Sequence, residues 1–169
     1  YPVVSGTKFY HNSGEQPSIG FVYGNKEAVK WRSVEGKAFT QDGAARTLWG
    51  ADQVPDDATT LVIVEGEMDL LACATAGIDS CVSVPNGAPQ KVSTKELNPE
   101  DDNKFAYIWA AKDLIERVDR IVLAADGDDA GFALAEELAR RIGRAKCSSV
   151  EWPDGCKDAN DVLLKLGPE

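Results

Sequence analysis

The feature that most constrains the fold is an apolar segment that ends in a cluster of aspartates. Ile121–Ala125 is a continuous apolar run, typical of a strand buried on both faces of a parallel sheet. Asp126, Asp128 and Asp129 follow it, and a helical pattern begins directly after them. Open α/β sheets bind ligands at the carboxyl ends of their strands, so we expect a ligand site at this turn. Neighbouring carboxylates repel unless a cation lies between them, which favours a Mg²⁺ site.

Most of the chain alternates apolar strand-like segments with helical patterns. This alternation predicts βαβ units and an α/β fold with a Rossmann-like parallel sheet flanked by helices. Besides the run described above, the expected strands are Thr60–Val64, Cys81–Val84 and Lys146–Glu151. The expected helices are one that follows the first of these strands and ends near Gly77, one at Phe105–Ile115, one that begins after Asp129, and one at Val162–Leu166. Between them, the polar stretch Gln90–Asn103 predicts a surface excursion.

The first part of the chain has a different pattern. Short strand-like segments at Phe21–Tyr23, Ala28–Arg32 and Lys37–Phe39 are separated by turn residues, Gly24-Asn25 and Glu35-Gly36. They predict a small, mostly antiparallel β subdomain. The Pro- and Asp-containing segment 53–57 is typical of a boundary, so we expect two units, residues 1–57 and residues 58–169.

Charge is distributed unevenly between these two parts. The chain has a net charge of −10, but residues 1–50 hold six Lys or Arg against four Asp or Glu, whereas residues 51–169 hold twelve against twenty-four. Lys30 and Arg32 are two residues apart and therefore share one face of a strand, with Trp31 on the other face. Lys37 falls close to them. These cations are equally compatible with a phosphate-binding surface and with an ordinary solvated strand face.

Carboxylates follow three separate predicted strands. Glu65 follows the first, Asp126 and Asp128 follow the third, and Asp158 lies in the loop after the fourth. Parallel strands end at one edge of their sheet, so these side chains are expected to converge. Oxygen ligands without paired His or Cys favour Mg²⁺ or Mn²⁺ over zinc.

Two other interpretations apply to the acidic residues. Asp128 or Asp129 could cap the following helix, and Glu67 or Asp69 could stabilise a helix N-terminus; for Glu67 and Asp129 we favour this structural role. A calcium-binding loop is the other alternative, because Asp126, Asp128, Gly131 and Glu137 match four EF-hand ligand or turn positions. Ala130 at a ligand position and a strand before the loop both argue against it.

Several classes of function have no support in the sequence. The four cysteines form no CxxC pair, His11 is the only histidine, and no catalytic triad, Walker loop or dinucleotide fingerprint is present. No apolar run approaches the roughly 20 residues that span a bilayer, and we expect no signal peptide and no membrane partner. Metal-dependent phosphoryl transfer fits the remaining pattern best.

Two motifs resemble the TOPRIM family, which includes primases, topoisomerases and nucleases. They are Val64–Asp69, which contains the Glu-Gly pair, and Asp126–Gly131, which contains Asp-x-Asp. Cys156–Leu163, Val84–Ala88 and Lys30–Arg32 are similar to the phage-type and Twinkle-like primase-helicase branch. The resemblance extends over the whole chain.

This resemblance implies a TOPRIM subdomain with a small N-terminal basic subdomain, together forming the RNA polymerase domain of a DNA primase. The implied metal ligands are Glu65, Asp126, Asp128 and Asp158, with two Mg²⁺ or Mn²⁺ ions. The implied catalytic residues are Glu65, Asp69, Asp126, Asp128 and Lys157. The implied nucleotide- or template-binding residues are Lys30, Arg32, Lys37, Asn86 and Gly87. The implied partners are a single-stranded DNA template, NTPs, a replicative helicase and a zinc-binding module that this chain lacks.

Three hypotheses follow for function. The first is DNA-templated synthesis of short RNA primers during replication, in a bacterial or phage-infected cytoplasm and associated with the nucleoid. The second is a TOPRIM nuclease that cleaves DNA with the same metals. The third is a non-catalytic single-stranded DNA-binding module of a helicase, for which Trp31 offers a stacking surface although the net charge of −10 argues against it.

Overall fold

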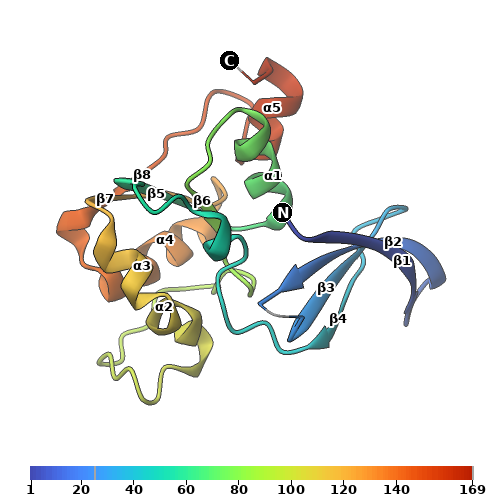
Figure 1. Ribbon diagram of the computed structural model, residues 1–169, viewed down its shortest axis with the longest axis horizontal. Coiled ribbons are helices and arrows are strands. Elements are labelled where there is room, and N and C mark those ends of the chain that lie inside the picture. Colours follow the sequence, from blue (N-terminus) through green and yellow to red (C-terminus); the bar gives the residue numbers. More distant parts are fainter. Residues whose placement is uncertain (25, 169) are drawn as a thin grey trace.

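The computed structural model describes residues 1–24 and 26–168, which form two four-stranded sheets (Figure 1). The antiparallel sheet consists, in spatial order, of β1 (Val3–Tyr10), β2 (Gly14–Tyr23), β3 (Ala28–Ser33) and β4 (Phe39–Gly43). The predicted antiparallel subdomain is therefore confirmed. Asn25, half of one predicted turn, lies outside the described residues. The prediction did not identify β1, which is exposed over most of its length and therefore lacks apolar alternation.

The second sheet is entirely parallel and has the order β6-β5-β7-β8. Its strands are β5 (Thr60–Val64), β6 (Cys81–Ser83), β7 (Arg120–Ala124) and β8 (Cys147–Ser149). The predicted parallel α/β architecture is confirmed, and the predicted bounds of β5 are those observed. The last predicted strand is shorter than expected.

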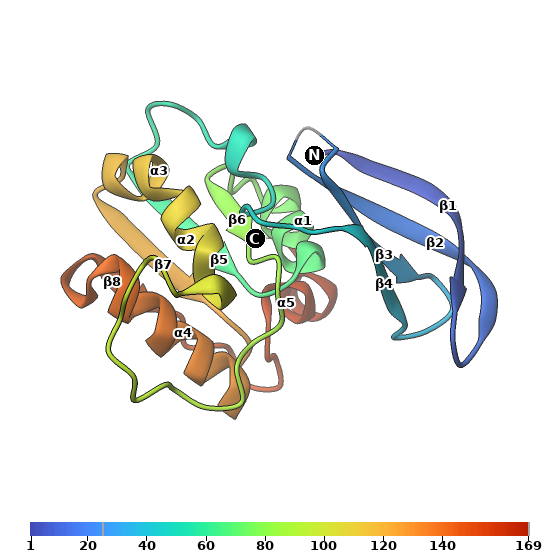
Figure 2. The same ribbon diagram turned by 90° about the horizontal axis from the view of Figure 1, so that it is seen from below.

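Helices cover both faces of the parallel sheet. On one face lie α2 (Ala106–Ala110), α3 (Lys112–Arg117) and α4 (Asp129–Ile142), and on the other lie α1 (Glu67–Thr75) and α5 (Ala159–Leu166) (Figure 2). The single helix predicted over Phe105–Ile115 is wrong, since the chain leaves helical geometry at Ala111 and forms two short helices. Gly77 has φ 83°, and the predicted end of α1 at this glycine is confirmed.

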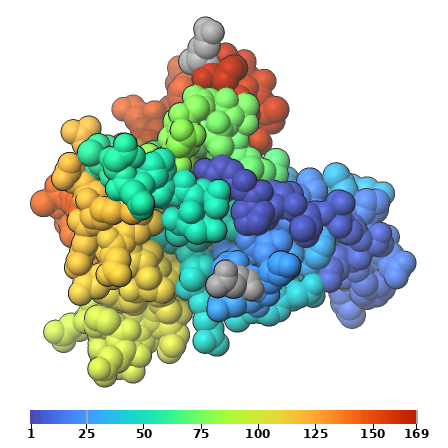
Figure 3. Space-filling view, viewed as in Figure 1, coloured from blue at the N-terminus to red at the C-terminus, as the bar shows by residue number. Residues whose placement is uncertain are grey.

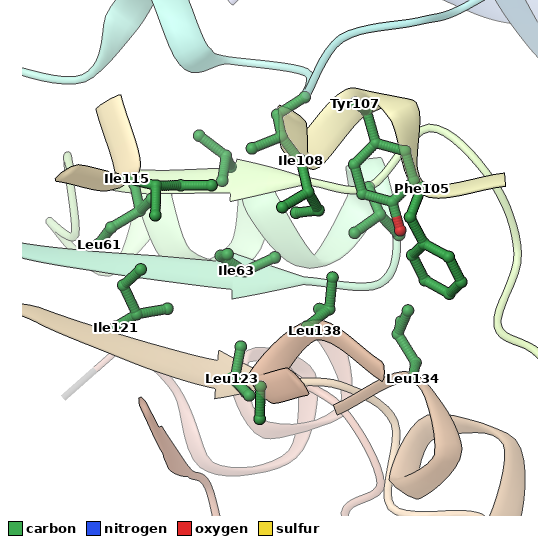
Figure 4. Packing of buried hydrophobic residues seen from close by; sticks show 14 of the residues in the cluster. Leu61, Ile63, Phe105, Tyr107, Ile108, Ile115, Ile121, Leu123, Leu134 and Leu138 are labelled. Carbon is green, nitrogen blue, oxygen red and sulfur yellow. The ribbon is translucent and has the colours of Figure 1, made fainter. Parts of the chain in front are cut away.

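The main core fills the space between the parallel sheet and α2, α3 and α4 (Figure 4). Leu61, Ile63 and Ile121 project from the strands and are almost wholly buried. Leu134 and Leu138, four residues apart on α4, meet them from the helix side. Each such side chain contributes roughly 1.5–3 kcal/mol through burial. This packing holds β5 and β7 together, so their carboxyl ends lie at one edge.

A second core joins the two sheets. It contains Phe21 and Tyr23 from β2, Leu70 from α1, and Trp49 from the connecting segment. The Trp49 indole lies edge-on to Phe21 and donates its Nε1–H to the carbonyl of Val22 at 3.0 Å. Figure 3 shows the antiparallel sheet (blue) as a lobe packed against the rest of the molecule. The orientation of the lobe is therefore set by buried apolar contacts.

The connecting segment belongs to both parts. Leu48 lies in the main core and Trp49 in the second, and Trp49 also forms an antiparallel bridge to Ser83 at the free edge of β6. The boundary after residue 57 stays a prediction. Within the described residues, no helix has the length and apolar character needed to cross a membrane.

Candidate active-site groove

A groove of about 740 Å³ lies between the antiparallel sheet and the carboxyl edge of the parallel sheet. Its size is in the range of small-molecule binding sites. Of the predicted site residues, only Asp128 is not part of its lining. The others all line it: Lys30, Arg32, Lys37, Glu65, Asp69, Asn86, Gly87, Asp126, Lys157 and Asp158.

One wall of the groove is cationic. Lys30 and Arg32 project into it from β3, and Lys37 reaches it from the loop between β3 and β4. Trp31 points to the opposite face of the sheet, where it packs on Gly20, as the alternation predicts. Trp31 is buried and donates its indole N–H to Asp42 at 2.8 Å. It is therefore no exposed stacking surface, and that prediction is wrong.

Glu65 lies in the opposite wall, directly after β5. Its Oε2 atom is buried and has no hydrogen-bond partner within the described residues. Burial raises the pKa of Glu65, and the negative charge of Asp126 raises it further, against a hydrogen bond from the backbone of Ala88. The charge of Asp128 adds to this effect. A cation or a proton at Oε2 would relieve the unfavourable charge.

Asp126 and Asp158 are held together by the ammonium group of Lys157. Lys157 Nζ lies 2.6 Å from Asp126 Oδ2 and 2.5 Å from Asp158 Oδ2. Although burial lowers the pKa of Lys157, the hydrogen bonds to these two carboxylates outweigh that effect and raise it. The backbone adds a further link, because the N–H of Gly127 donates to the carbonyl of Lys157 at 2.7 Å. The ends of β7 and the loop before α5 are thereby fixed against each other.

Two of the predicted metal ligands cap helices. Asp128 Oδ1 accepts from the N–H of Gly131 at the start of α4, and Asp158 Oδ1 accepts from the N–H of Asp161 at the start of α5. The preference for Asp129 as the cap of α4 is wrong, since Asp129 is the first helical residue. Asp158 keeps its other oxygen toward Lys157 and the groove, whereas Asp128 does not line it.

Asp69 ties α1 to α5. Its Oδ1 accepts from the backbone N–H of Asn160 at 3.1 Å, and its carboxylate is buried. Burial raises the pKa of Asp69 to about 7, against the hydrogen bond from Asn160. Gly66 leaves room for this carboxylate, because a Cβ there would lie 2.8 Å from Asp69 Oδ2. The Glu-Gly pair of the first motif thus has a steric basis.

Asn86 and Gly87 follow β6 at the rim of the groove and are exposed. Asn86 Nδ2 lies 3.4 Å from the carbonyl of Lys104, a long contact that leaves the amide available to a ligand. Both residues therefore line the groove, and their role in binding nucleotide or template stays a prediction.

Eight of the lining residues were not predicted as site residues, and three of them, Phe39, Gln41 and Glu67, extend the chemistry of the walls. Phe39 is 59% exposed and lies beside Arg32, whose guanidinium is 5.8 Å from the ring. Gln41 follows two residues later on β4 and faces the same way. Glu67 was assigned to the helix terminus, but its carboxylate lies 2.5 Å from Lys30 Nζ in the antiparallel sheet. In the sequence, only the two-residue spacing of Phe39 and Gln41 indicates that both side chains lie on one face of β4.

The calcium-loop alternative is wrong. Glu137, the residue required at its last position, is buried on α4. It pairs there with Arg140 and Arg141 and accepts from the backbone N–H of Ser93. Its carboxylate therefore anchors the 90–103 excursion to α4 and is not available to the aspartate turn.

The carboxylate oxygens of the groove are suitable ligands for a divalent cation. Glu65 offers a buried oxygen without a partner, and Asp126 and Asp158 already enclose one cation, the ammonium of Lys157. Among the described residues, no three His, Cys, Asp or Glu side chains converge as a ready-made metal site. Binding of an ion would thus require these carboxylates to reorient, with Lys157 moving aside.

Comparison with known proteins agrees with this geometry. The Toprim domain family matches residues 59–151, which is more than half of the chain. The chain is 43% identical over 164 residues to the Twinkle homolog protein, chloroplastic/mitochondrial, of Arabidopsis thaliana, and 44% identical over 159 residues to the Primase homolog protein of the same plant. These alignments cover 92% and 89% of this chain but only 23% and 47% of the two relatives.

Solved structures show the same fold. The primase fragment of the bacteriophage T7 primase-helicase protein has a TM-score of 0.72 at 24% identity, over 92% of this chain and 61% of that chain. The RNA polymerase domain of Mycobacterium tuberculosis primase DnaG has a TM-score of 0.61 at 18% identity, over 96% and 56% of the two chains. The chain therefore belongs to the Toprim family, and its domain is of the primase type found in Twinkle-like proteins.

Proposed function

We propose that this chain is the RNA polymerase domain of a DNA primase, which synthesises short RNA primers from NTPs on a single-stranded DNA template with Mg²⁺ or Mn²⁺. The observation that carries the proposal is the opposition of charges across one groove. Lys30, Arg32 and Lys37 face a wall of carboxylates that includes Glu65 and Asp126. Carboxylates alone repel a triphosphate, and cations alone do not hold a divalent metal.

The cationic wall supplies the attraction for phosphate. Arg32 offers a planar guanidinium that suits two phosphate oxygens at once, and Lys30 and Lys37 offer ammonium donors. Phe39 presents an exposed ring in the same wall, where a nucleobase can stack. We assign the triphosphate and the template backbone to this side of the groove.

The acidic wall supplies the sites for catalysis. Glu65, Asp126 and Asp158 would hold the divalent ions, which lower the pKa of an attacking hydroxyl group and neutralise a departing pyrophosphate. As the alternative to holding an ion, Glu65 can take up the proton of a primer 3′ hydroxyl, because its Oε2 has no partner in the described structure and its pKa is raised by burial. Asp69 orients the start of α5 through Asn160. Lys157 keeps Asp126 and Asp158 together and can turn its ammonium toward the pyrophosphate.

The proposed partners follow from the relatives. One relative is named a Twinkle homolog and another structure comes from a primase-helicase, so we propose that a replicative helicase acts with this domain. A zinc-binding module that helps to choose the start site remains part of the proposal. The predicted bacterial or phage cytoplasm stays a prediction. The name of the plant relative favours an organelle instead, which cell fractionation with an antibody to this chain would test.

A product assay tests the function. The protein is incubated with single-stranded DNA, labelled NTPs and Mg²⁺ or Mn²⁺, and compared with Glu65→Gln and Asp126→Asn. We expect short labelled RNA from the wild type and none from either variant. Asp129→Asn is the matched control, because it removes one exposed carboxylate three residues from Asp126 and outside the groove, and it should leave the product unchanged.

The other two hypotheses predict different results in the same tubes. A nuclease would shorten the DNA without incorporating NTPs, and a binding module would retain DNA with no product in any variant. Lys37→Gln removes a positive charge from the cationic wall, and Lys112→Gln removes one from the exposed surface of α3. Comparing the two variants distinguishes a specific effect of the wall from a general effect of net charge. The proposal expects lower affinity for NTPs only in the first of these variants.

A further inference from the structure

Glu67 is a buried carboxylate that the proposed mechanism does not yet use. It lies in the first turn of α1, where water and the helix N-terminus could stabilise its charge, yet its side chain is turned into the joint between the two sheets. The residue is only 5% exposed. Burial of a carboxylate is unfavourable unless donors compensate it, so its partners must define its position.

Both partners come from the antiparallel sheet. Lys30 Nζ lies 2.5 Å from Glu67 Oε1, and the hydroxyl of Tyr23 donates to the same oxygen at 2.5 Å. Tyr23 is the last residue of β2 and is 1% exposed. Burial and then the charge of Glu67 raise the pKa of Tyr23, so its hydroxyl remains a donor across the physiological range. Tyr23 thus fixes the carboxylate, and the carboxylate fixes the lysine.

The consequence concerns the free end of Lys30. Its side chain is 20% exposed and lines the groove, opposite Glu65 and Asp126. An ammonium group has three donors, and Glu67 takes one of them, so two remain for a ligand. A free lysine loses rotamer entropy when it binds phosphate, whereas a lysine already held in place loses less.

We propose that Glu67, anchored by Tyr23, is a positioning residue that holds Lys30 ready for a phosphate group of the incoming nucleoside triphosphate. This inference rests on the proposed function and adds to it the residues that set triphosphate affinity. The ligand is the triphosphate because Lys30 lines the groove beside the first turn of α1, in the same groove as the carboxylates that would hold the divalent ions.

The test measures equilibrium binding of each of the four NTPs with Mg²⁺ and without DNA, and then KM and kcat for primer synthesis. In Tyr23→Phe and Glu67→Ala we expect the dissociation constant and KM to rise by about tenfold, because Lys30 must then be ordered by the ligand itself. The kcat value should change by less than about twofold, because uniform binding is lost without a change in the chemical step. Glu67→Gln should recover part of the affinity, since its amide oxygen can accept from both donors.

Trp49→Phe is the matched control for a purely structural role. It removes another hydrogen bond between the same two parts of the molecule, from Trp49 Nε1 to Val22, and leaves Lys30 untouched. We expect it to lower the unfolding temperature without changing NTP affinity. Lys30→Met should lose at least as much affinity as Glu67→Ala, and the double variant should lose no more than Lys30→Met alone.

Three results would overturn the inference. If Tyr23→Phe and Glu67→Ala lower stability but bind NTPs like the wild type, the three residues are only a structural joint. If their affinity rises, Glu67 competes with phosphate for Lys30 and does not position it. If the wild type itself binds no NTP, the proposed function fails and the inference fails with it, an outcome distinct from the other two.

Discussion

Replacement of Lys157 by methionine is the perturbation whose effect the structure specifies most fully. The methionine keeps the length of the side chain and removes the ammonium that joins Asp126 and Asp158 at 2.6 and 2.5 Å. The two carboxylates then face each other without a counter-charge. We therefore expect the variant to be less stable without metal and to respond more strongly to divalent cations than the wild type.

The size of the effect follows from exposure. Lys157 is 52% exposed, and solvent screens its ion pairs. Breaking each pair therefore costs well below the roughly 3–5 kcal/mol lost when a fully buried pair is broken. The carboxylates themselves are mostly buried, which places each pair near the upper end of exposed ion pairs, about 1 kcal/mol. Loss of both pairs costs about 2 kcal/mol, or about 4–8 °C in Tm for a domain of this size.

Thermal unfolding in EDTA and in increasing Mn²⁺ measures both parts of this prediction. An ion bound at 100 times its Kd adds about 2.7 kcal/mol of stability, so Mn²⁺ should restore the variant to at least the wild-type Tm. Lys165→Met is the matched control, because Lys165 is equally exposed but contacts only one carboxylate, Asp161. Equal Tm values in EDTA, or the same Mn²⁺ response in Lys157→Met and Lys165→Met, would refute the reasoning.

Three other substitutions have defined outcomes. Gly131→Ala should destabilise the fold by at least about 2 kcal/mol in urea unfolding, because its Cβ would lie 2.0 Å from the carbonyl oxygen of Asp126; unchanged stability would mean that the two segments are less close than described. Arg141→Met should cost up to about 3–5 kcal/mol, because Arg141 is 4% exposed and joins Asp102 to the buried Glu137; the first then keeps only the Trp109 indole N–H, and the second only Arg140 and the N–H of Ser93; a loss below about 1 kcal/mol would contradict this account of the network. Asp69→Asn should gain stability over the wild type as pH rises, because the folded wild type binds more protons than the unfolded chain between the ordinary Asp pKa of 3.8 and the folded value of about 7, and so loses stability across that window. The free energy of unfolding in urea of Asp69→Asn, minus that of the wild type, should grow by at most about 1.4 kcal/mol per pH unit from about pH 4 to 7 and then level off. A difference that does not change with pH would show that Asp69 titrates normally.

The sequence predicts the parallel sheet well because its signal is local. Leu61–Val64 and Ile121–Ala125 are unbroken apolar runs, and such runs form strands wherever both faces are covered. The acidic residues that follow them converge because parallel strands share a direction, which requires no knowledge of side-chain contacts. The break at Ala111 escaped prediction because no Gly or Pro marks it, and hydrogen bonds typical of a helix continue on both sides.

The partners of the acidic side chains could not be predicted from their positions in the sequence. Glu67 and Asp129 have the same local context, each in the first turn of a helix. The first is buried against Lys30 and Tyr23, which are 37 and 44 residues away, and the second is exposed. Only the docking of the antiparallel sheet distinguishes them. The same docking brings Phe39 into the groove.

The central claim is that this groove joins nucleotides on a DNA template, and one reaction with two labels tests it most directly. Single-stranded DNA with a fluorophore at its 5′ end is incubated with the protein, Mg²⁺ or Mn²⁺ and α-³²P-labelled NTPs, and both signals are resolved on one denaturing gel. The account predicts new labelled RNA of primer length and intact DNA, with the RNA absent in Glu65→Gln. Shortened fluorescent DNA, or no labelled product in the presence of a zinc-binding module and helicase, would contradict it.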